Sequence, residues 1–184
     1  MRRSLHFTWI MEQELADILA HTEVLTHCKS ADNLQTAPQK RRRVIENSAI
    51  KSLIPVEEFK ALLPLICDCE TSQDPEHWTP ENPLCGHCAV VSLVVQDLLG
   101  GELLRASLAE IPEFAHMRSH YWNRLPDGTE VDFSAPQFGG RYPVGLKSEA
   151  RTRSYVLSFP ETAQRYKLLM TRLGKKLGLI GSAE

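Results

Sequence analysis

A cysteine, a histidine and an aspartate in this sequence have the types and the order that catalysis by a thiol nucleophile requires. Cys88 opens an apolar stretch typical of a helix, whose positive end favours the thiolate. His120 and Asp132 stand at the start and near the end of a predicted β-hairpin. We therefore expect them to be cross-strand neighbours within one or two residues of register. The imidazole would act as general base and acid, and the carboxylate would orient it.

The same chemistry requires donors for an oxyanion and a surface that holds a substrate. The backbone N–H of Cys88 is one candidate donor, and the side-chain amide of Asn82, in the preceding loop, is a second. Trp78, Tyr121 and Trp122 lie nearby in the sequence and are candidates for lining a substrate pocket. Aromatic residues that flank a strand are nevertheless core residues more often than pocket residues.

The cysteines permit two other interpretations. The segment Cys85-Gly-His-Cys88 is a Cys-x-x-Cys motif before a helix, as in thiol–disulfide oxidoreductases, but no buried strand precedes it. Cys67, Cys69, Cys85 and Cys88 together have the number and loop length of a structural zinc site, although a single residue between the first two is unusual. A simpler interpretation is that Cys67 and Cys69 are small hydrophobic residues.

Hydrophobic spacing and turn residues predict the elements that must position these side chains. Residues 87–99 contain no Gly or Pro and are apolar nearly all round, which is typical of a buried central helix ending at Gly100. The other expected elements are a helix over 56–65, a strand over 102–108, a hairpin of 120–125 and 129–133, a short strand over 155–157 and a helix from Pro160 onward.

The order of these elements indicates an α+β fold in which the central buried helix packs on an antiparallel sheet. We expect an N-terminal helical extension and linker over residues 1–50 and an α+β domain over residues 51–184. In the extension, residues 9–27 have helical spacing, whereas residues 28–48 are polar. The basic run Lys40–Arg43 is typical of a solvated face.

Composition and charge narrow the classes of partner. The chain has 184 residues, with 21 Lys and Arg against 23 Asp and Glu, so its net charge of -2 gives no general attraction to nucleic acid or anionic membranes. No apolar run approaches the roughly 18 residues of a membrane helix. Glu12 and Glu14 interrupt the segment where a signal peptide would be apolar. We expect a cytoplasmic protein without nucleic-acid or membrane partners.

Residues 78–102 and 119–132 closely resemble the YunG family, small bacterial proteins of unassigned activity, and the tail over 152–166 is also similar. The resemblance implies a papain-like or transglutaminase-like fold, with a nucleophilic cysteine at the start of the central helix. It assigns the nucleophile to Cys88, the imidazole to His120 and the acidic strand position to Asp132. The position of Cys85 is commonly not a cysteine in this family, which argues against a shared redox or four-cysteine zinc site.

These observations predict acyl transfer through a thioester, on an amide of a small molecule, peptide or protein, without a cofactor. The sequence does not choose among hydrolysis, deamidation and transfer to an amine. The alternative is a non-catalytic binding module with the same fold. In that module Cys88 would be a buried thiol or would bind zinc together with Cys67, Cys69 and Cys85.

Overall fold

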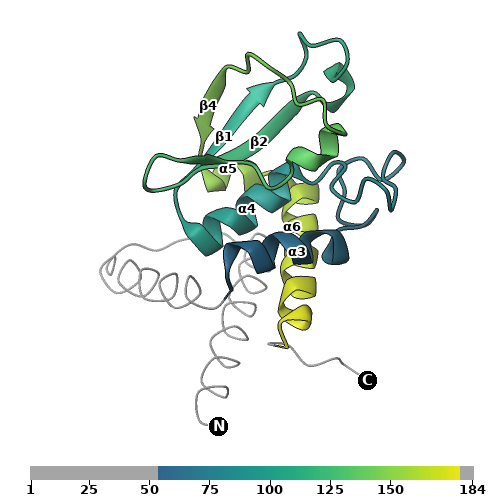
Figure 1. Ribbon diagram of the computed structural model, residues 1–184, viewed down its shortest axis with the longest axis vertical. Helices are drawn as coiled ribbons and strands as arrows, with labels where there is room; N and C mark the ends of the chain where they lie inside the picture. Colours follow the sequence, from purple (N-terminus) through teal and green to yellow (C-terminus); the bar gives the residue numbers. More distant parts are fainter. Residues whose placement is uncertain (1–53, 179–184) are drawn as a thin grey trace, which may run out of the picture.

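The computed structural model describes residues 54–178, which form a mixed α+β structure with a four-stranded antiparallel sheet (Figure 1). Its elements are α3 (Val56–Ile66), α4 (Cys88–Leu99), β1 (Glu102–Ser107), η2 (Ala115–Met117), β2 (Ser119–Arg124), β3 (Glu130–Val131), η3 (Ala135–Phe138), β4 (Ser148–Arg151), α5 (Arg153–Leu157) and α6 (Pro160–Lys176). The α+β class is thereby confirmed. The helix expected over 9–27, the polar stretch and the boundary at residue 50 lie outside the described residues.

Helix α4 is the centre of the hydrophobic core, as its sequence predicts. Val90, Leu93 and Val94 are fully buried. They belong to a cluster that also contains apolar residues of α3 and α6 and, from the sheet, Leu103. Figure 1 shows β1, β2 and β4 on one side of α4, while α6 crosses α3 and α4 on the other. The helix ends at Gly100, whose φ of 77° is in the left-handed region that glycine tolerates.

The sheet has the strand order β3-β2-β1-β4, and its register determines which residues face α4. Leu103 pairs with Asn123, and Ala106 pairs with His120. Asn123 donates a hydrogen bond from its side-chain amide to the backbone carbonyl of Ser92 at 3.0 Å, so this residue lies on the helix side. Successive side chains of a strand alternate between faces, which directs Trp122 to the opposite face.

The region from Ser148 to Leu157 differs from the sequence prediction. The strand expected over 155–157 is wrong, because these residues belong to helix α5. The hydroxyl of Thr152 accepts a hydrogen bond from the backbone N–H of Tyr155 and so caps this helix. The fourth strand is instead β4, which pairs with β1 and consists of Ser, Glu, Ala and Arg. Such a short, polar edge strand lacks the apolar alternation by which strands are predicted.

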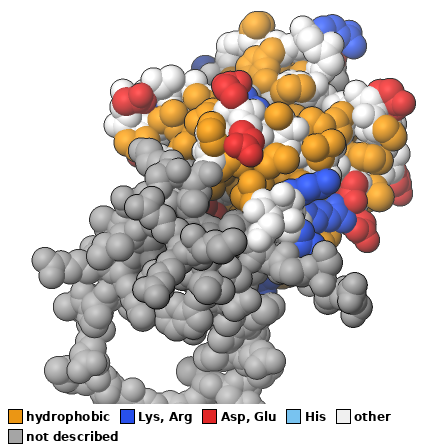
Figure 2. All heavy atoms as spheres, turned by 60° about the horizontal axis from the view of Figure 1, so that its bottom comes forward, with side chains coloured by type: hydrophobic (Ala, Val, Ile, Leu, Met, Phe, Trp, Pro, Cys, Tyr) orange, Lys and Arg blue, Asp and Glu red, His pale blue; other side chains and the backbone are white. Residues whose placement is uncertain are grey.

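The surface of the described part mixes apolar and charged side chains. Figure 2 shows a face on which hydrophobic side chains predominate, with acidic residues scattered among them and Lys and Arg gathered toward one edge. Leu65 of α3 is among the exposed large hydrophobic residues. No helix within residues 54–178 combines the length and the apolar character needed to cross a membrane.

Candidate active site

Cys88 is the first residue of α4, and a tight turn delivers it there. Gly86 has a φ of 73°, and a Cβ at this position would lie 2.4 Å from the hydroxyl oxygen of Ser72 and 2.8 Å from the backbone nitrogen of Asp74. Only glycine fits such a conformation and such close neighbours. Cys88 is 5% exposed, so the turn places its thiol at the helix N-terminus, almost wholly within the protein.

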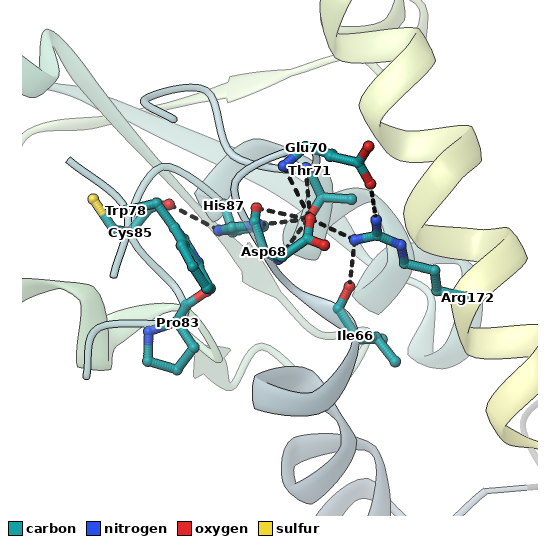
Figure 3. Close-up of polar contacts among 9 residues, drawn as sticks. All are labelled: Ile66, Asp68, Glu70, Thr71, Trp78, Pro83, Cys85, His87 and Arg172. Atoms are coloured by element: carbon teal, nitrogen blue, oxygen red, sulfur yellow. Dashed lines mark hydrogen bonds and ion pairs between the residues drawn. The ribbon is translucent and has the colours of Figure 1, made fainter. Parts of the chain in front are cut away.

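His87, beside the nucleophile candidate, has a structural role. Its Nδ1 lies 2.8 Å from the carbonyl oxygen of Cys85, and its Nε2 lies 2.8 Å from the hydroxyl of Thr71 (Figure 3). Burial lowers the pKa of His87 to about 4. The ring is therefore neutral at pH 7, with Nδ1–H as donor and Nε2 as acceptor. A neutral ring with both nitrogens bonded holds the turn rather than exchanging protons.

The loop that supports this turn is anchored to α6. The guanidinium of Arg172 forms ion pairs with Asp68 and Glu70 and donates to the backbone carbonyl of Ile66 at 3.2 Å (Figure 3). The hydroxyl of Thr71 accepts a hydrogen bond from the backbone N–H of Asp68 at 2.9 Å. The chain of contacts thus runs from α6 through the loop to His87 and the start of α4.

His120 and Asp132 meet as the hairpin predicts. The distance between Nε2 of His120 and Oδ2 of Asp132 is 2.6 Å. Asn123 pairs with Val131, so continuing the register by one residue sets Asp132 opposite Trp122, two residues from His120. This offset agrees with the expected one or two residues. The two side chains therefore join diagonally across the hairpin.

The carboxylate of Asp132 is held in its charged form. Its Oδ1 accepts hydrogen bonds from the backbone N–H of Ser134 at 2.9 Å and from the hydroxyl of Ser134 at 2.8 Å. Burial acts to raise the pKa of Asp132, but the bonds from His120, Ser134 and Tyr142 outweigh it and lower this pKa. Asp132 is therefore an anion, and it accepts a hydrogen bond from the N–H of His120.

His120 also interacts with Cys88. It is fully buried, and burial alone would lower its pKa, but the hydrogen bonds to Asp132 and Cys88 raise the pKa to about 9. Asp132 engages Nε2, which leaves Nδ1 as the other nitrogen of the ring. The ring stacks on Trp122 with centroids 5.6 Å apart and meets Phe138 edge-on at 4.8 Å. The described hydrogen bonds thus join His120 to Asp132, and the role of Cys88 as the partner of this pair stays a prediction.

Gln137, in η3, belongs to this site and was not anticipated from the sequence. Its Nε2 lies 3.2 Å from Nδ1 of His120, and its side chain is buried at 6% exposure. The side chain of Asn82 donates to the backbone carbonyl of Gln137 at 3.0 Å. Asn82 therefore secures the segment that brings Gln137 to the imidazole. Because Gln137 follows the hairpin in a stretch without regular hydrophobic spacing, no sequence pattern marks it.

The three aromatic pocket candidates lie in different environments. Trp78 is half-buried, and its indole N–H donates to the carbonyl oxygen of Pro83 at 3.0 Å (Figure 3). Tyr121 packs against the main core. Trp122 lies on the same face of β2 as His120, stacks on its ring and donates to Glu130. Only Trp122 has a contact with the triad among these three.

The cysteines do not gather into a ligand set. Cys67 is buried, and burial raises its pKa to about 12, whereas Cys69 is exposed and Cys85 is partly exposed. All four cysteines from Cys67 to Cys88 are free thiols. Across residues 54–178, no three His, Cys, Asp or Glu side chains are grouped so that they could hold a metal ion. The described residues therefore do not form the four-cysteine zinc site of the alternative prediction.

Comparison with known proteins places these elements in a family. The family model described as "YunG protein" matches residues 56–178, from α3 to the end of the described region. The "Uncharacterized protein YunG" of Bacillus subtilis (strain 168) is 36% identical over 61 residues, which are 33% of this chain and 46% of the relative. The chain thus spans less than half of the length of the curated relative it matches. No solved structure matches the chain. Since the family match covers the loop, the central helix and the whole sheet, the chain belongs to the YunG family.

Proposed function

We propose that the protein is a cysteine-dependent acyl-transfer enzyme with a papain-like arrangement, in which Cys88 is the nucleophile. The observation that carries the proposal is the buried His120–Asp132 pair, 2.6 Å apart, whose imidazole also interacts with Cys88 at the start of α4. A thiol, an imidazole and an anionic carboxylate in this order are what thiol catalysis requires. A nucleophile at the start of a central helix that packs on an antiparallel sheet supports the papain-like arrangement.

The proposed reaction proceeds in two balanced steps. His120 takes the thiol proton, and the sulfur of Cys88 attacks the carbonyl carbon of an amide, forming a C–S bond. The C–N bond then breaks, and the imidazolium gives its proton to the leaving amine. Water or a second amine, deprotonated by His120, attacks the thioester and releases Cys88. The carboxylate of Asp132 holds the ring and stabilises its charged form throughout.

The negative oxygen that forms during the attack requires donors beside the sulfur. The backbone N–H of Cys88 is one of the first N–H groups of α4, which have no acceptor within the helix. We propose the amide of Gln137 as the second donor, since its Nε2 lies 3.2 Å from Nδ1 of His120. One amide hydrogen of Asn82 already binds the Gln137 carbonyl, so Asn82 acts by positioning this segment.

Alkylation as a function of pH tests the proposal directly. The purified protein is treated with iodoacetamide between pH 5.5 and 9, and the rate at each cysteine is mapped by mass spectrometry. We expect Cys88 to react well below the reference thiol pKa of about 8.5 and to lose this reactivity in His120→Ala. The exposed Cys69 serves as an internal control in the same sample.

The opposite result would leave the binding module as the function. If Cys88 titrates like an ordinary thiol and His120→Ala leaves its rate unchanged, the two side chains do not act as a pair. Circular dichroism of His120→Ala is required alongside, because loss of a buried ring also affects folding. A second variant, Asp132→Asn, keeps the shape of the carboxyl group and should reduce the low-pH reactivity without loss of structure.

A further inference from the structure

Helix α6 carries two arginines two turns apart, and only one of them is neutralised. Arg172 forms ion pairs with Asp68 and Glu70. Arg165 has no ion-pair partner within residues 54–178, and its Nη2 donates only to the neutral hydroxyl of Thr162 at 3.2 Å. Residues seven positions apart lie on about the same face of a helix. The two guanidinium groups therefore differ because the neighbouring elements present carboxylates to Arg172 and, within the described residues, form no ion pair with Arg165.

Arg165 is also a partly buried cation with an unsatisfied nitrogen. Its Nη1 is inaccessible to solvent and has no hydrogen-bond partner among the described residues. Arg153, by contrast, is half-buried and forms an ion pair with Asp97 at 3.0 Å. A buried charge without a counterion is costly, so an arrangement of this kind is expected where an anion binds during function.

The charge of Arg165 acts at the start of α4. Arg165 interacts electrostatically with Cys88 and with His87, so the guanidinium lies within range of the proposed nucleophile. Its hydrogen bond within the described residues goes to Thr162 and not to the sulfur. Glu161, the one carboxylate that interacts with Arg165, is exposed, and water screens an exposed charge.

We infer that Arg165 makes the Cys88 site selective for acyl substrates that carry a negative charge, such as a carboxylate, close to the reacting carbonyl. The inference rests on the proposed function and names its substrate class. His120 is the proposed partner of the Cys88 sulfur, so the second cation is available to an anion that lies beyond the sulfur. In a partly desolvated site, a guanidinium attracts such an anion more strongly than it would in water.

Two alkylating reagents of similar size and different charge test this selectivity. Iodoacetate is an anion and iodoacetamide is neutral, and both form the same bond to sulfur with loss of iodide. We expect the rate with iodoacetate, divided by the rate with iodoacetamide, to fall at Cys88 by roughly three- to thirtyfold in Arg165→Gln. Arg165→Lys keeps the charge and should retain most of the ratio. Both reagents consume the same thiolate, so a change in the thiol pKa cancels from the ratio.

Lys176→Gln is the matched control, because it removes one positive charge from the same helix at an exposed position. It should leave the ratio unchanged. If Arg165→Gln slows both reagents equally, Arg165 acts on the thiolate alone and the selectivity is overturned while the proposed enzyme stands. If wild-type Cys88 has no activated thiolate at all, the proposed function itself fails. Circular dichroism spectra of each variant confirm that the compared proteins are folded.

Discussion

At the scale of single residues, the character of His120 depends on Asp132. The hydrogen bond that His120 donates to Asp132 is the largest of the contributions that raise the His120 pKa to about 9. We expect Asp132→Asn to lower this pKa by roughly one to two pH units, because a neutral amide no longer stabilises the imidazolium. The ring resonances of His120 in an NMR titration measure the pKa directly.

Glu130→Gln is a suitable control for this prediction, because it removes a carboxylate two residues away. Glu130 accepts a hydrogen bond from the indole of Trp122, which stacks on His120, yet it has no bond to the imidazole. Its substitution should change the His120 pKa much less than Asp132→Asn does. Equal effects of the two substitutions would show that long-range charge, rather than the direct bond, determines the pKa.

The same pKa predicts how stability depends on pH. His120 titrates at about 9 in the folded protein and near 6.5 when unfolded, so its folded-state pKa is raised. Its stabilising contribution is full below pH 6.5 and is lost as the pH rises through about 9. We expect the free energy of unfolding in urea to decrease over this range by at most about 3 kcal/mol. In His120→Gln this decrease should be absent.

Sequence analysis located Cys88, His120 and Asp132 because each occupies a recognisable position in an element. The first residue of an apolar helix and the two ends of a hairpin are visible in the residue pattern. Gln137 and Arg165 have no such mark. Gln137 reaches His120 from a short irregular segment, and Arg165 is a polar residue on a helix whose apolar face alone shows periodicity. Their roles depend on tertiary contacts between elements distant in the chain.

At the scale of elements, the turn before α4 is sensitive to one methyl group. Gly86→Ala requires a left-handed φ and places the new Cβ 2.4 Å from the hydroxyl oxygen of Ser72. Gly128, in the hairpin turn, also has a positive φ, of 87°, but open space around its Cα. We expect Gly128→Ala to lower the free energy of unfolding by about 1 kcal/mol and Gly86→Ala by about 3 kcal/mol or more.

Urea denaturation of the two glycine variants provides the comparison. Since the backbone strain is shared, the difference between them measures the crowding at Gly86. Gly86→Ala should also slow alkylation of Cys88, because the displaced turn carries the start of α4, whereas Gly128→Ala should not. Similar stability losses in both variants would mean that the loop beside Ser72 relaxes without cost.

A second contact between elements joins α4, α5 and α6. The hydroxyl of Tyr166 donates to Asp97, and Arg153 forms an ion pair with the same carboxylate. Burial raises the pKa of Asp97, so this carboxylate depends on its partners. Tyr166→Phe should cost about 1–2 kcal/mol in the free energy of unfolding, since a buried acceptor loses a donor. Tyr155→Phe, at an exposed hydroxyl, should cost much less.

The elements also show where prediction from sequence reaches its limit. Helix α4 and the hairpin were predicted because their stabilising contacts follow the local pattern of apolar and turn residues. Residues 155–157 were predicted as a strand from their composition, yet Thr152 supplies a helix cap just before them. Strand β4 forms because β1 offers a free edge, and its own residues do not encode that pairing.

At the scale of the whole molecule, the family match covers nearly all of the described region. It spans residues 56–178, and the main hydrophobic cluster of the described residues lies almost entirely within it, joining apolar residues of α3, α4, the sheet and α6. The boundary predicted between residues 50 and 51 lies outside the described residues and stays a prediction.

A chain of residues 51–184 tests that boundary. We expect it to unfold in one cooperative transition in urea and to keep the reactivity of Cys88 at low pH, because the described contacts of the triad and of α4 lie within it. The full chain, measured in parallel, is the reference for both quantities. A shortened chain that unfolds without cooperativity would place part of the core before residue 51. A cooperative chain with an unreactive Cys88 would instead show that residues 1–50 contribute to the site.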